Sequence, residues 1–288
     1  MKKLFEIKNL RCSYDKHYRE GISKVVLEIN ALDIPRGKKV FIVGESGIGK
    51  STILETLGMM NNTIVPSSDL VFNFTLNSGE TIQLDTLWHN DKNLSKFRLD
   101  HYSFIFQSTN LMRNFTAFEN IAFTRMLQGY NKIECFEKTK QVLLDLGLEH
   151  IDEARYAQEL SGGQQQRLAF ARAVIPDFTV LFGDEPTGNL DGENAMRVME
   201  VLSRRLDKSE NASAIIVSHD MHLATTFADI IIKIRKQVRP KNSEHDEEIF
   251  YGIIDSECIY MPTMSRSQWS NGINCFSSYE FEDFLRKK

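Results

Sequence analysis

With 288 residues, 42% of them hydrophobic, the chain is long enough to bury a sizeable core in one or two domains. Its net charge of -4 argues against the general attraction to nucleic acid that a basic protein has. The four cysteines lack C-x-x-C spacing and no apolar run approaches the roughly 18 residues of a membrane span, so we expect no zinc module, disulfide framework or transmembrane helix. We expect a protein of the reducing cytosol that reaches a membrane only through a partner chain.

The chain begins with predicted strands at 3–10 and 24–34. The alternation of apolar and polar residues at the N-terminus is typical of a strand and not of a signal peptide. Between the strands, Tyr14 offers a flat aromatic face on which an adenine base could stack. A tyrosine packed in the core fits the same spacing equally well.

Residues 44–52 read GESGIGKST and match the phosphate-binding pattern G-x-x-x-x-G-K-S/T. They lie between an apolar run at 40–43, which predicts a strand, and residues 53–57, which predict a helix. Glycines allow the backbone to turn and to direct its N–H groups, with the positive end of the helix, at a polyphosphate. We expect Lys50 to reach the β- and γ-phosphates and the Ser51 hydroxyl to hold Mg²⁺. The candidate nucleotide-binding residues of this loop are Gly44, Glu45, Ser46, Gly47, Ile48, Gly49, Lys50, Ser51 and Thr52.

After the loop, residues 71–76 and 81–84 predict an antiparallel hairpin, and residues 93–101 predict a short helix. A strand predicted at 101–106 ends on Gln107, which would therefore lie on the ligand side of an α/β sheet. Its amide could contact both Mg²⁺ and a water near the γ-phosphate, although such a glutamine is commonly an ordinary loop residue. From 116 to 148 the spacing is helical, with Gly147 as a helix stop.

The stretch LSGGQQQR at 160–167 predicts a helix that starts at Ser161, because Ser161 and Gln164 have the spacing of a capping box. The glycines Gly162 and Gly163 leave the backbone N–H groups of this helix start accessible, which makes a second anion-binding helix terminus. Since the chain already has a phosphate loop, the natural ligand of the second terminus is the γ-phosphate held by another copy.

An apolar strand predicted at 179–183 ends in Asp184 and Glu185. A carboxylate at such a strand end suits Mg²⁺, and the adjacent Glu185 suits a general base that orients water. A loop at 187–191, a helix at 193–206 and a buried strand at 214–217 follow. His219, just after that strand, could donate a hydrogen bond to the γ-phosphate, although a single histidine is more often structural.

In this order, the motifs GESGIGKST, Gln107, LSGGQQQR, VLFGDE, GNLD and the histidine of SHD resemble those of the ATP-binding cassette ATPases over about residues 1–235. Finer features are similar to the ATPases of lipoprotein-release, macrolide-export and division-associated systems. The resemblance implies an α/β fold, a P-loop NTPase core with an inserted α-helical subdomain and an N-terminal antiparallel β subdomain. It implies a nucleotide-binding domain at 1–235, with the helical subdomain at about 108–175, and leaves 236–288 as a C-terminal extension.

By the same resemblance, two cassettes dimerise head-to-tail around two ATP, as a homodimer or with a second cassette, and drive a membrane permease from the cytoplasmic face. No nucleic-acid partner is implied. The implied catalytic residues are Glu185, His219, Lys50 and Gln107, and the implied Mg²⁺ ligands are Ser51, Gln107 and Asp184. Beyond the phosphate loop, the implied nucleotide contacts are Tyr14 (with Tyr18 as the alternative), Ser161, Gly162, Gly163, Gln164 and Asp191, the last in the loop that crosses the dimer contact.

The chain departs from the family pattern in three places. The region between the phosphate loop and Gln107 is longer than usual, and Gly183 stands where alanine is common. After Arg235, the charged run KQVRPKNSEHDEE predicts a mobile loop. Residues 249–260 predict a pair of strands, and residues 277–285 predict a terminal helix with a capping box and one apolar face. Packing of this helix on the body of the protein is favoured over packing on a partner. Two other functions stay open at this point, namely a soluble ATPase switch acting on nucleic acid or ribosomes and a regulatory cassette with poor turnover.

Overall fold

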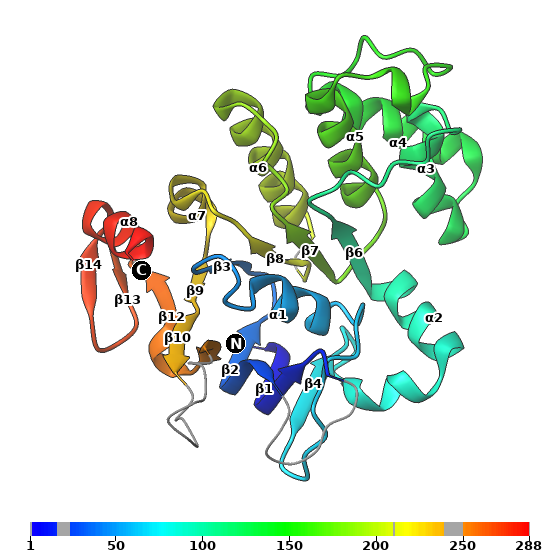
Figure 1. Ribbon diagram of the computed structural model, residues 1–288. Coiled ribbons are helices and arrows are strands. Elements are labelled where there is room, and N and C mark those ends of the chain that lie inside the picture. Colours follow the sequence, from blue (N-terminus) through cyan, green and yellow to red (C-terminus); the bar gives the residue numbers. More distant parts are fainter. Residues whose placement is uncertain (1, 16–23, 210, 239–249, 288) are drawn as a thin grey trace. The chain divides into compact units, whose positions relative to one another are not determined.

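The computed structural model describes residues 2–15, 24–209, 211–238 and 250–287. The chain, drawn as a ribbon in Figure 1, divides into two compact units. Unit 1 comprises Met1–Leu94 and His219–Lys288, and unit 2 comprises Ser95–Ser218. The first boundary falls inside helix α2 (Asp91–His101), where the sequence predicts a short helix. Tyr18 and most of the charged run after Arg235 lie outside the described residues.

Unit 1 contains a six-stranded sheet in the order β10-β11-β2-β1-β4-β5. Alternate side chains of β4 are buried, and the rings of Phe5 on β1 and Phe74 on β4 meet edge to face with centroids 5.1 Å apart. This sheet confirms the predicted N-terminal antiparallel subdomain and its hairpin, except that β11 joins β2 in parallel. Its strands are β1 (Lys3–Ser13), β2 (Val25–Pro35), β4 (Val71–Thr75), β5 (Thr81–Gln83), β10 (Arg235–Val238) and β11 (Phe250–Ile254).

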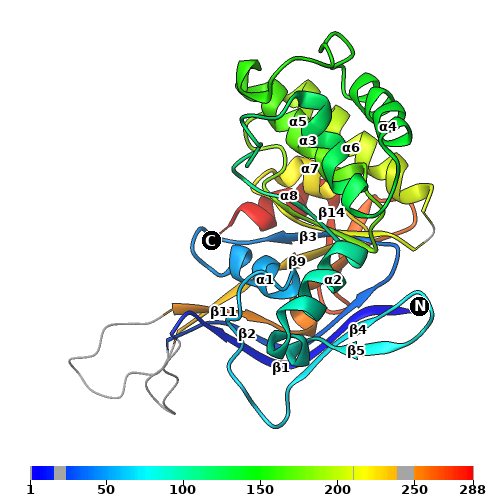
Figure 2. The ribbon, with the colours of Figure 1, turned by 90° about the vertical axis from the view of Figure 1, so that its right-hand side faces the viewer.

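A second set of strands in unit 1 starts from the parallel pair β3 (Lys39–Val43) and β9 (Ile230–Lys233). It continues through β12 (Ile259–Pro262), β13 (Gln268–Ser270) and β14 (Cys275–Ser277), each antiparallel to the strand before it. Helix α1 (Lys50–Leu57) lies between the two sets of strands, as Figure 2 shows. The remaining elements of the unit are α7 (Met221–Phe227), α8 (Ser278–Arg286) and the 3₁₀ turns at Leu84–His89 and Ser256–Cys258.

The segment after residue 235 extends both sets of strands. The strand pair predicted at 249–260 is wrong as a pair, because β11 joins β2 and β10 whereas β12 joins β9. Each strand finds its partner far away in the sequence, and local alternation carries no information about such partners. The predicted terminal helix is confirmed as α8, with a capping box at Ser277 and its packing face on unit 1. Phe281 is buried in that face and stacks on Trp269 with ring centroids 5.0 Å apart.

Unit 2 contains three parallel strands in the order β8-β7-β6, namely β6 (Tyr102–Ile105), β7 (Val180–Asp184) and β8 (Ser213–Val217). The side chains of β8 are buried throughout, as an apolar run without alternation predicts. Its helices are α3 (Ala117–Leu127), α4 (Lys132–Asp145), α5 (Gly162–Val174) and α6 (Gly192–Asp207), with a 3₁₀ turn at Ala157–Glu159.

The helices α3, α4 and α5 supply the helical section that the sequence predicts between β6 and β7. The stop at Gly147 is confirmed, because α4 ends at Asp145 and Gly147 has a φ of 66°, a conformation that glycine adopts at low cost after a helix. Among the described residues, no helix is both long enough and apolar enough to span a bilayer.

Candidate functional site

The phosphate loop of unit 1 presents helix α1 without a side-chain cap. Gly49 is the N-cap residue, with a φ of 104°, and no side chain accepts a hydrogen bond from the first turn. The first turn also carries no acidic residue. Helices α3, α5 and α6 each begin with a side chain that accepts such a bond. The first N–H groups of α1 and its positive end therefore suit an external anion such as a phosphate.

The side chain of Lys50 folds back over the same loop. It is only 6% exposed, and its ammonium donates to the carbonyl oxygens of Gly44 at 2.9 Å and Glu45 at 2.7 Å. Gly47 has a φ of 77° and open space around it, so the loop turns there at no steric cost. The loop thus offers a cation and backbone donors together, as its sequence predicts.

Two more predicted residues belong to unit 1. Tyr14 lies beside the start of α1, where its hydroxyl is 3.0 Å from Thr52 Oγ1, and its side chain is 54% exposed. Partial burial is the main cause that raises the pKa of Tyr14, and the charge of Glu55 adds to it. His219 is exposed and directly precedes Asp220, the N-cap residue of α7.

In unit 2, Asp184 is the last residue of β7, and Glu185 follows with a φ of 49°, unusual for a residue other than glycine. This bend is held by a hydrogen bond from the Glu185 N–H to the Val217 carbonyl at 3.0 Å. Gln107 Nε2 donates to Glu185 Oε2 at 3.3 Å. The structure thus brings together two residues that the sequence selects separately, at neighbouring strand ends.

The turn formed by Ser161, Gly162 and Gly163 at the start of α5, which we call the signature turn, faces outward from unit 2. Ser161 is exposed and caps the helix, because its hydroxyl oxygen accepts from the Gln164 N–H at 3.4 Å. In return, the Ser161 N–H donates to Gln164 Oε1 at 2.9 Å. The predicted capping box is confirmed. Gly162 is exposed, and a Cβ atom built on it meets nothing within 4 Å. The helix start is accessible to a ligand from outside the unit.

The loop before α6 lies next to the signature turn, because a Cβ built on Gly163 would be 4.0 Å from Leu190. Asp191 caps α6 by accepting from the Asn194 N–H at 2.9 Å. The two hydrogen bonds from Asn194, and the charge of Arg167, lower the pKa of Asp191 and keep it ionised.

One residue with a positioning role was missed by the sequence reasoning. Gln166 is 1% exposed, and its Nε2 donates to the Pro186 carbonyl at 3.2 Å, which ties α5 to the turn that carries Glu185. The available signal was its spacing, since Gln166 lies three and four residues before the buried Ala169 and Phe170 and so on the inner face of the helix.

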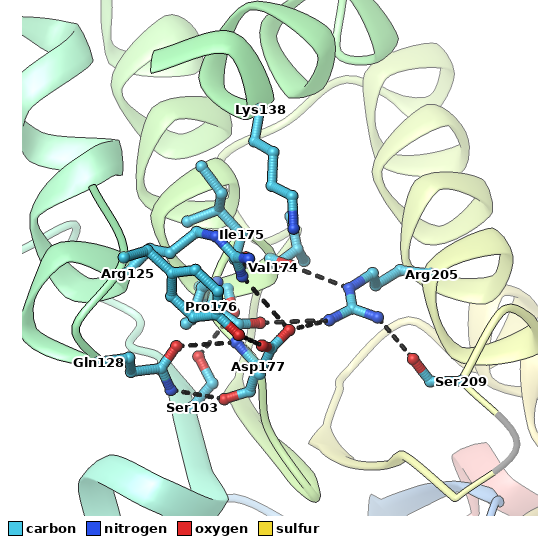
Figure 3. Close-up of polar contacts among 12 residues, drawn as sticks. Ser103, Arg125, Gln128, Lys138, Val174, Ile175, Pro176, Asp177, Arg205 and Ser209 are labelled. Atoms are coloured by element: carbon cyan, nitrogen blue, oxygen red, sulfur yellow. Dashed lines mark hydrogen bonds and ion pairs between the residues drawn. The ribbon is translucent and has the colours of Figure 1, made fainter. Parts of the chain in front are cut away.

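The other end of α5 is fixed by a charged network around Asp177 (Figure 3). Arg125 of α3 is 2% exposed and donates to Ile175 O, Asp177 and Glu134, while its guanidinium stacks on the Tyr130 ring at 3.5 Å. From α6, Arg205 donates to Val174 O and Pro176 O. Gln128 exchanges two hydrogen bonds with the Asp177 backbone, at 2.7 and 2.9 Å. Helices α3 and α6 thereby hold the segment that joins α5 to β7.

Ionisation of Asp177 is favoured inside this network. Partial burial opposes the charged form, but the hydrogen bond from Tyr130 and the charge of Arg125 outweigh it, so the pKa of Asp177 is lowered. The side chain is 54% exposed, so solvent screens the interaction.

Comparison with known proteins gives consistent matches. The sequence profile of the ABC transporter family matches residues 27–188. The lipoprotein-releasing system ATP-binding protein LolD of Colwellia psychrerythraea is 35% identical over 239 residues, which cover 83% of this chain and 88% of that protein. The ABC transporter ATP-binding protein YtrE of Bacillus subtilis is 37% identical over 69% of this chain and 81% of its own length. The macrolide export ATP-binding/permease protein MacB of Aggregatibacter actinomycetemcomitans is 38% identical over 81% of this chain, but the match spans 33% of that longer protein.

Solved structures agree. The ATP-binding cassette MJ0796, in a dimeric post-hydrolysis state bound to ADP and Pi, has a TM-score of 0.67 and 28% identity, covering 80% of this chain and 93% of that chain. The predicted fold class is thereby confirmed. The chain belongs to the ABC transporter family, as an ATP-binding subunit with ATPase activity.

Proposed function

We propose that the chain is the ATP-hydrolysing subunit of a transporter, that it closes head-to-tail on a second cassette around two ATP, and that it drives a membrane permease. The observation that carries the proposal is the exposed signature turn. Ser161 and Gly162 are exposed at the start of α5 on the outside of unit 2, although the chain has its own phosphate loop in unit 1. A second copy of the cassette is the partner that supplies a γ-phosphate to that turn. The dimeric state of MJ0796 supports this arrangement.

The residues present fit MgATP. The uncapped start of α1 and the ammonium of Lys50 suit the phosphates, and Tyr14 offers a half-exposed ring for adenine. Ser51, Gln107 and Asp184 supply hydroxyl, amide and carboxylate oxygens, the donor set that Mg²⁺ prefers. When bound, the ion neutralises charge on the phosphates.

In this proposal, the side chains contribute to catalysis mainly by positioning the attacking water and the transferring phosphoryl group. Glu185 orients the attacking water and accepts its proton, and Gln107 orients the Glu185 carboxylate through the bond at 3.3 Å. His219 donates a hydrogen bond to the transferring phosphoryl, and Ser161 and Gly163 of the second cassette close over it. Asp191 caps α6 at the dimer contact.

An apolar stripe on α3 supports a membrane partner. Phe123, Met126 and Leu127 are 39%, 40% and 55% exposed, and their spacing puts them on one face of the helix. Exposed apolar patches commonly mark protein interfaces. We propose that this stripe receives the permease, which holds the cassette at the cytoplasmic face of the membrane. The relatives named LolD and MacB favour a system of lipoprotein-extraction or export type.

The test uses Glu185→Gln, which keeps the shape of the side chain and removes the base. Turnover is expected to fall by at least about 100-fold, with ATP affinity retained and a nucleotide-locked dimer accumulating. Glu200→Gln, in the exposed part of α6, is the matched control and is expected to turn over normally. Unchanged turnover in Glu185→Gln would remove Glu185 from this role.

The locked protein is then used as bait in detergent-solubilised native membranes. A stoichiometric multi-span membrane protein is expected to copurify. The same bait carrying Leu127→Glu is expected to keep the locked dimer and lose that partner. Recovery of ribosomal or nucleic-acid material with no membrane protein would contradict the proposal and favour a soluble switch.

A further inference from the structure

The hairpin formed by β10 and β11 lies against the phosphate loop. It follows the part of the chain that the family profile matches, which ends at residue 188. Strand β11 runs parallel to β2, with Gly252 opposite Leu27. The side chain of Leu27 also borders the loop, since a Cβ built on Gly49 would lie 3.3 Å from Leu27 Cβ. The hairpin and the loop therefore share one neighbour.

The closest approach is made by Gly252. A Cβ built on this residue would lie 2.2 Å from the carbonyl oxygen of Ile48, inside the phosphate loop. The φ of Gly252 is not in the left-handed region, so backbone conformation does not require glycine here. Glycine is required here by the lack of space, because any side chain would push the Ile48 peptide or displace β11.

A charge from the same hairpin also reaches the loop. Lys236 Nζ of β10 lies 3.4 Å from Glu45 Oε2 and 4.3 Å from the centroid of the Phe250 ring on β11. Glu45 is the second residue of the phosphate loop, and its carboxylate has the same sign as a bound polyphosphate. The ammonium of Lys236 offsets that repulsion.

Each contact has an ordinary explanation when taken alone. A half-exposed ion pair contributes little to stability, and a glycine can be a detail of sheet packing. Their convergence is what carries the inference, because both act on one five-residue stretch, Glu45–Gly49. A third contact lies beside them, where a Cβ on Gly44 would be 3.5 Å from Ile234, the residue before β10.

We propose that the β10–β11 hairpin is a positioning element for the phosphate loop, in which Gly252 sets the place of the Ile48 peptide and Lys236 neutralises Glu45. The hairpin thereby raises the affinity for the polyphosphate part of the nucleotide. This inference rests on the proposed role of the loop in binding ATP.

The electrostatic half is tested by a double-mutant cycle on the full-length protein. Dissociation constants for ATP, ADP and AMP are measured for Lys236→Ala, Glu45→Gln and the double variant. Lys236→Ala is expected to weaken ATP and ADP binding by roughly threefold, to leave AMP binding unchanged, and to have no effect in the Glu45→Gln background. Lys236→Arg is expected to restore binding. An equal loss in both backgrounds, an equal loss for AMP, or no loss at all would overturn this half.

The steric half is tested with Gly252→Ala. The KM for ATP is expected to rise by about tenfold while kcat changes by less than about threefold, because the shifted loop binds the phosphates less well but Glu185 and Gln107, which are proposed to orient the attacking water, are untouched. Gly79→Ala is the control, since the φ of 92° at this position is strained for alanine but a Cβ there meets no neighbouring atom. It is expected to lower the melting temperature without changing KM. If Gly252→Ala leaves KM unchanged, or if Gly79→Ala raises it equally, the steric half fails.

Lys50→Ala separates the role of the loop in binding ATP from the role of the hairpin. If Lys50→Ala binds ATP as tightly as the wild type, the loop is not the phosphate site and the hairpin inference falls with it. If Lys50→Ala loses binding while the Lys236 and Gly252 variants bind like the wild type, only the hairpin inference is overturned.

Discussion

The phosphate loop and the base of the signature helix are immobilised by different means. The loop is held mainly by close packing, most tightly where Gly252 meets the Ile48 carbonyl and less tightly at Gly44 beside Ile234 and Gly49 beside Leu27. The base of α5 is held mainly by charged and hydrogen-bonded side chains around Asp177 (Figure 3).

The difference predicts which changes each region tolerates. Close backbone packing is sensitive to one added methyl group and insensitive to pH, whereas a charged network is sensitive to a lost charge and to protonation. Each region is therefore expected to fail under a different set of substitutions.

The largest effect is expected on the loop side, from Lys50→Ala. Loss of the ammonium that is proposed to face the phosphates should weaken ATP binding by at least about 100-fold, as expected for a charge-assisted contact in a nearly buried position. Isothermal titration with ATP measures it. Lys8→Ala, an exposed lysine on β1 of the same unit, is the control and should bind ATP normally. Equal affinity of the two variants would contradict the comparison.

On the network side, Arg125→Met should reduce the free energy of unfolding by about 2 kcal/mol, because it removes charged hydrogen bonds that join α3 to the Asp177 segment. Denaturant titration measures this loss. Arg113→Met, beyond the network, is the control for the substitution itself. A loss that is no larger in Arg125→Met than in this control would show that the network contributes no net stability.

The variants Ser161→Ala and Thr116→Ala are each expected to lose the same, smaller amount of unfolding free energy. Both residues cap a helix of unit 2 with a capping box, so each variant should lose about 1 kcal/mol. Only Ser161→Ala should also reduce ATP turnover, because only Ser161 is proposed to contact the γ-phosphate. If the two variants lost turnover equally, the effect of Ser161 would be one of stability alone.

The smallest effect is a pH dependence from Asp177. Its pKa is lowered in the folded protein, so its stabilisation is present above the unfolded pKa and disappears as the pH falls through the folded value. Asp177→Asn should therefore be less stable than the wild type near neutral pH by under about 1 kcal/mol, given its exposure, and the gap should close in acid. Unfolding measured from pH 7 to pH 3 tests this, and a gap that widens in acid would be the contrary result.

The sequence predicted the features that are determined by interactions between residues close together in the chain. Ser161 with Gln164, Ser277 with Glu280, and Gly147 after α4 mark helix ends through bonds within a few residues, and all three are confirmed. The strand ends that carry Gln107 and Glu185 were also predictable, because buried strands read as apolar runs.

What the sequence did not predict depends on distant partners. Strand β10 was missed because Arg235–Val238 is exposed throughout and shows no alternation. The placement of β11 was missed because Gly252 is required by the Ile48 carbonyl of the phosphate loop, which no local pattern reveals. The role of Gln166 depends on Pro186, in a turn that follows another strand.

The position of β11 also has a consequence for biosynthesis. During vectorial synthesis the phosphate loop and β2 leave the ribosome long before β11 does, and until then the edge of β2 that β11 covers stays open. In a nascent chain, every residue of the loop motif is therefore synthesised before the strand that is proposed to position the loop. Nucleotide would then favour the completed chain, since by the proposed role of the hairpin it binds more tightly, and so stabilises more, the form in which the late strand has docked.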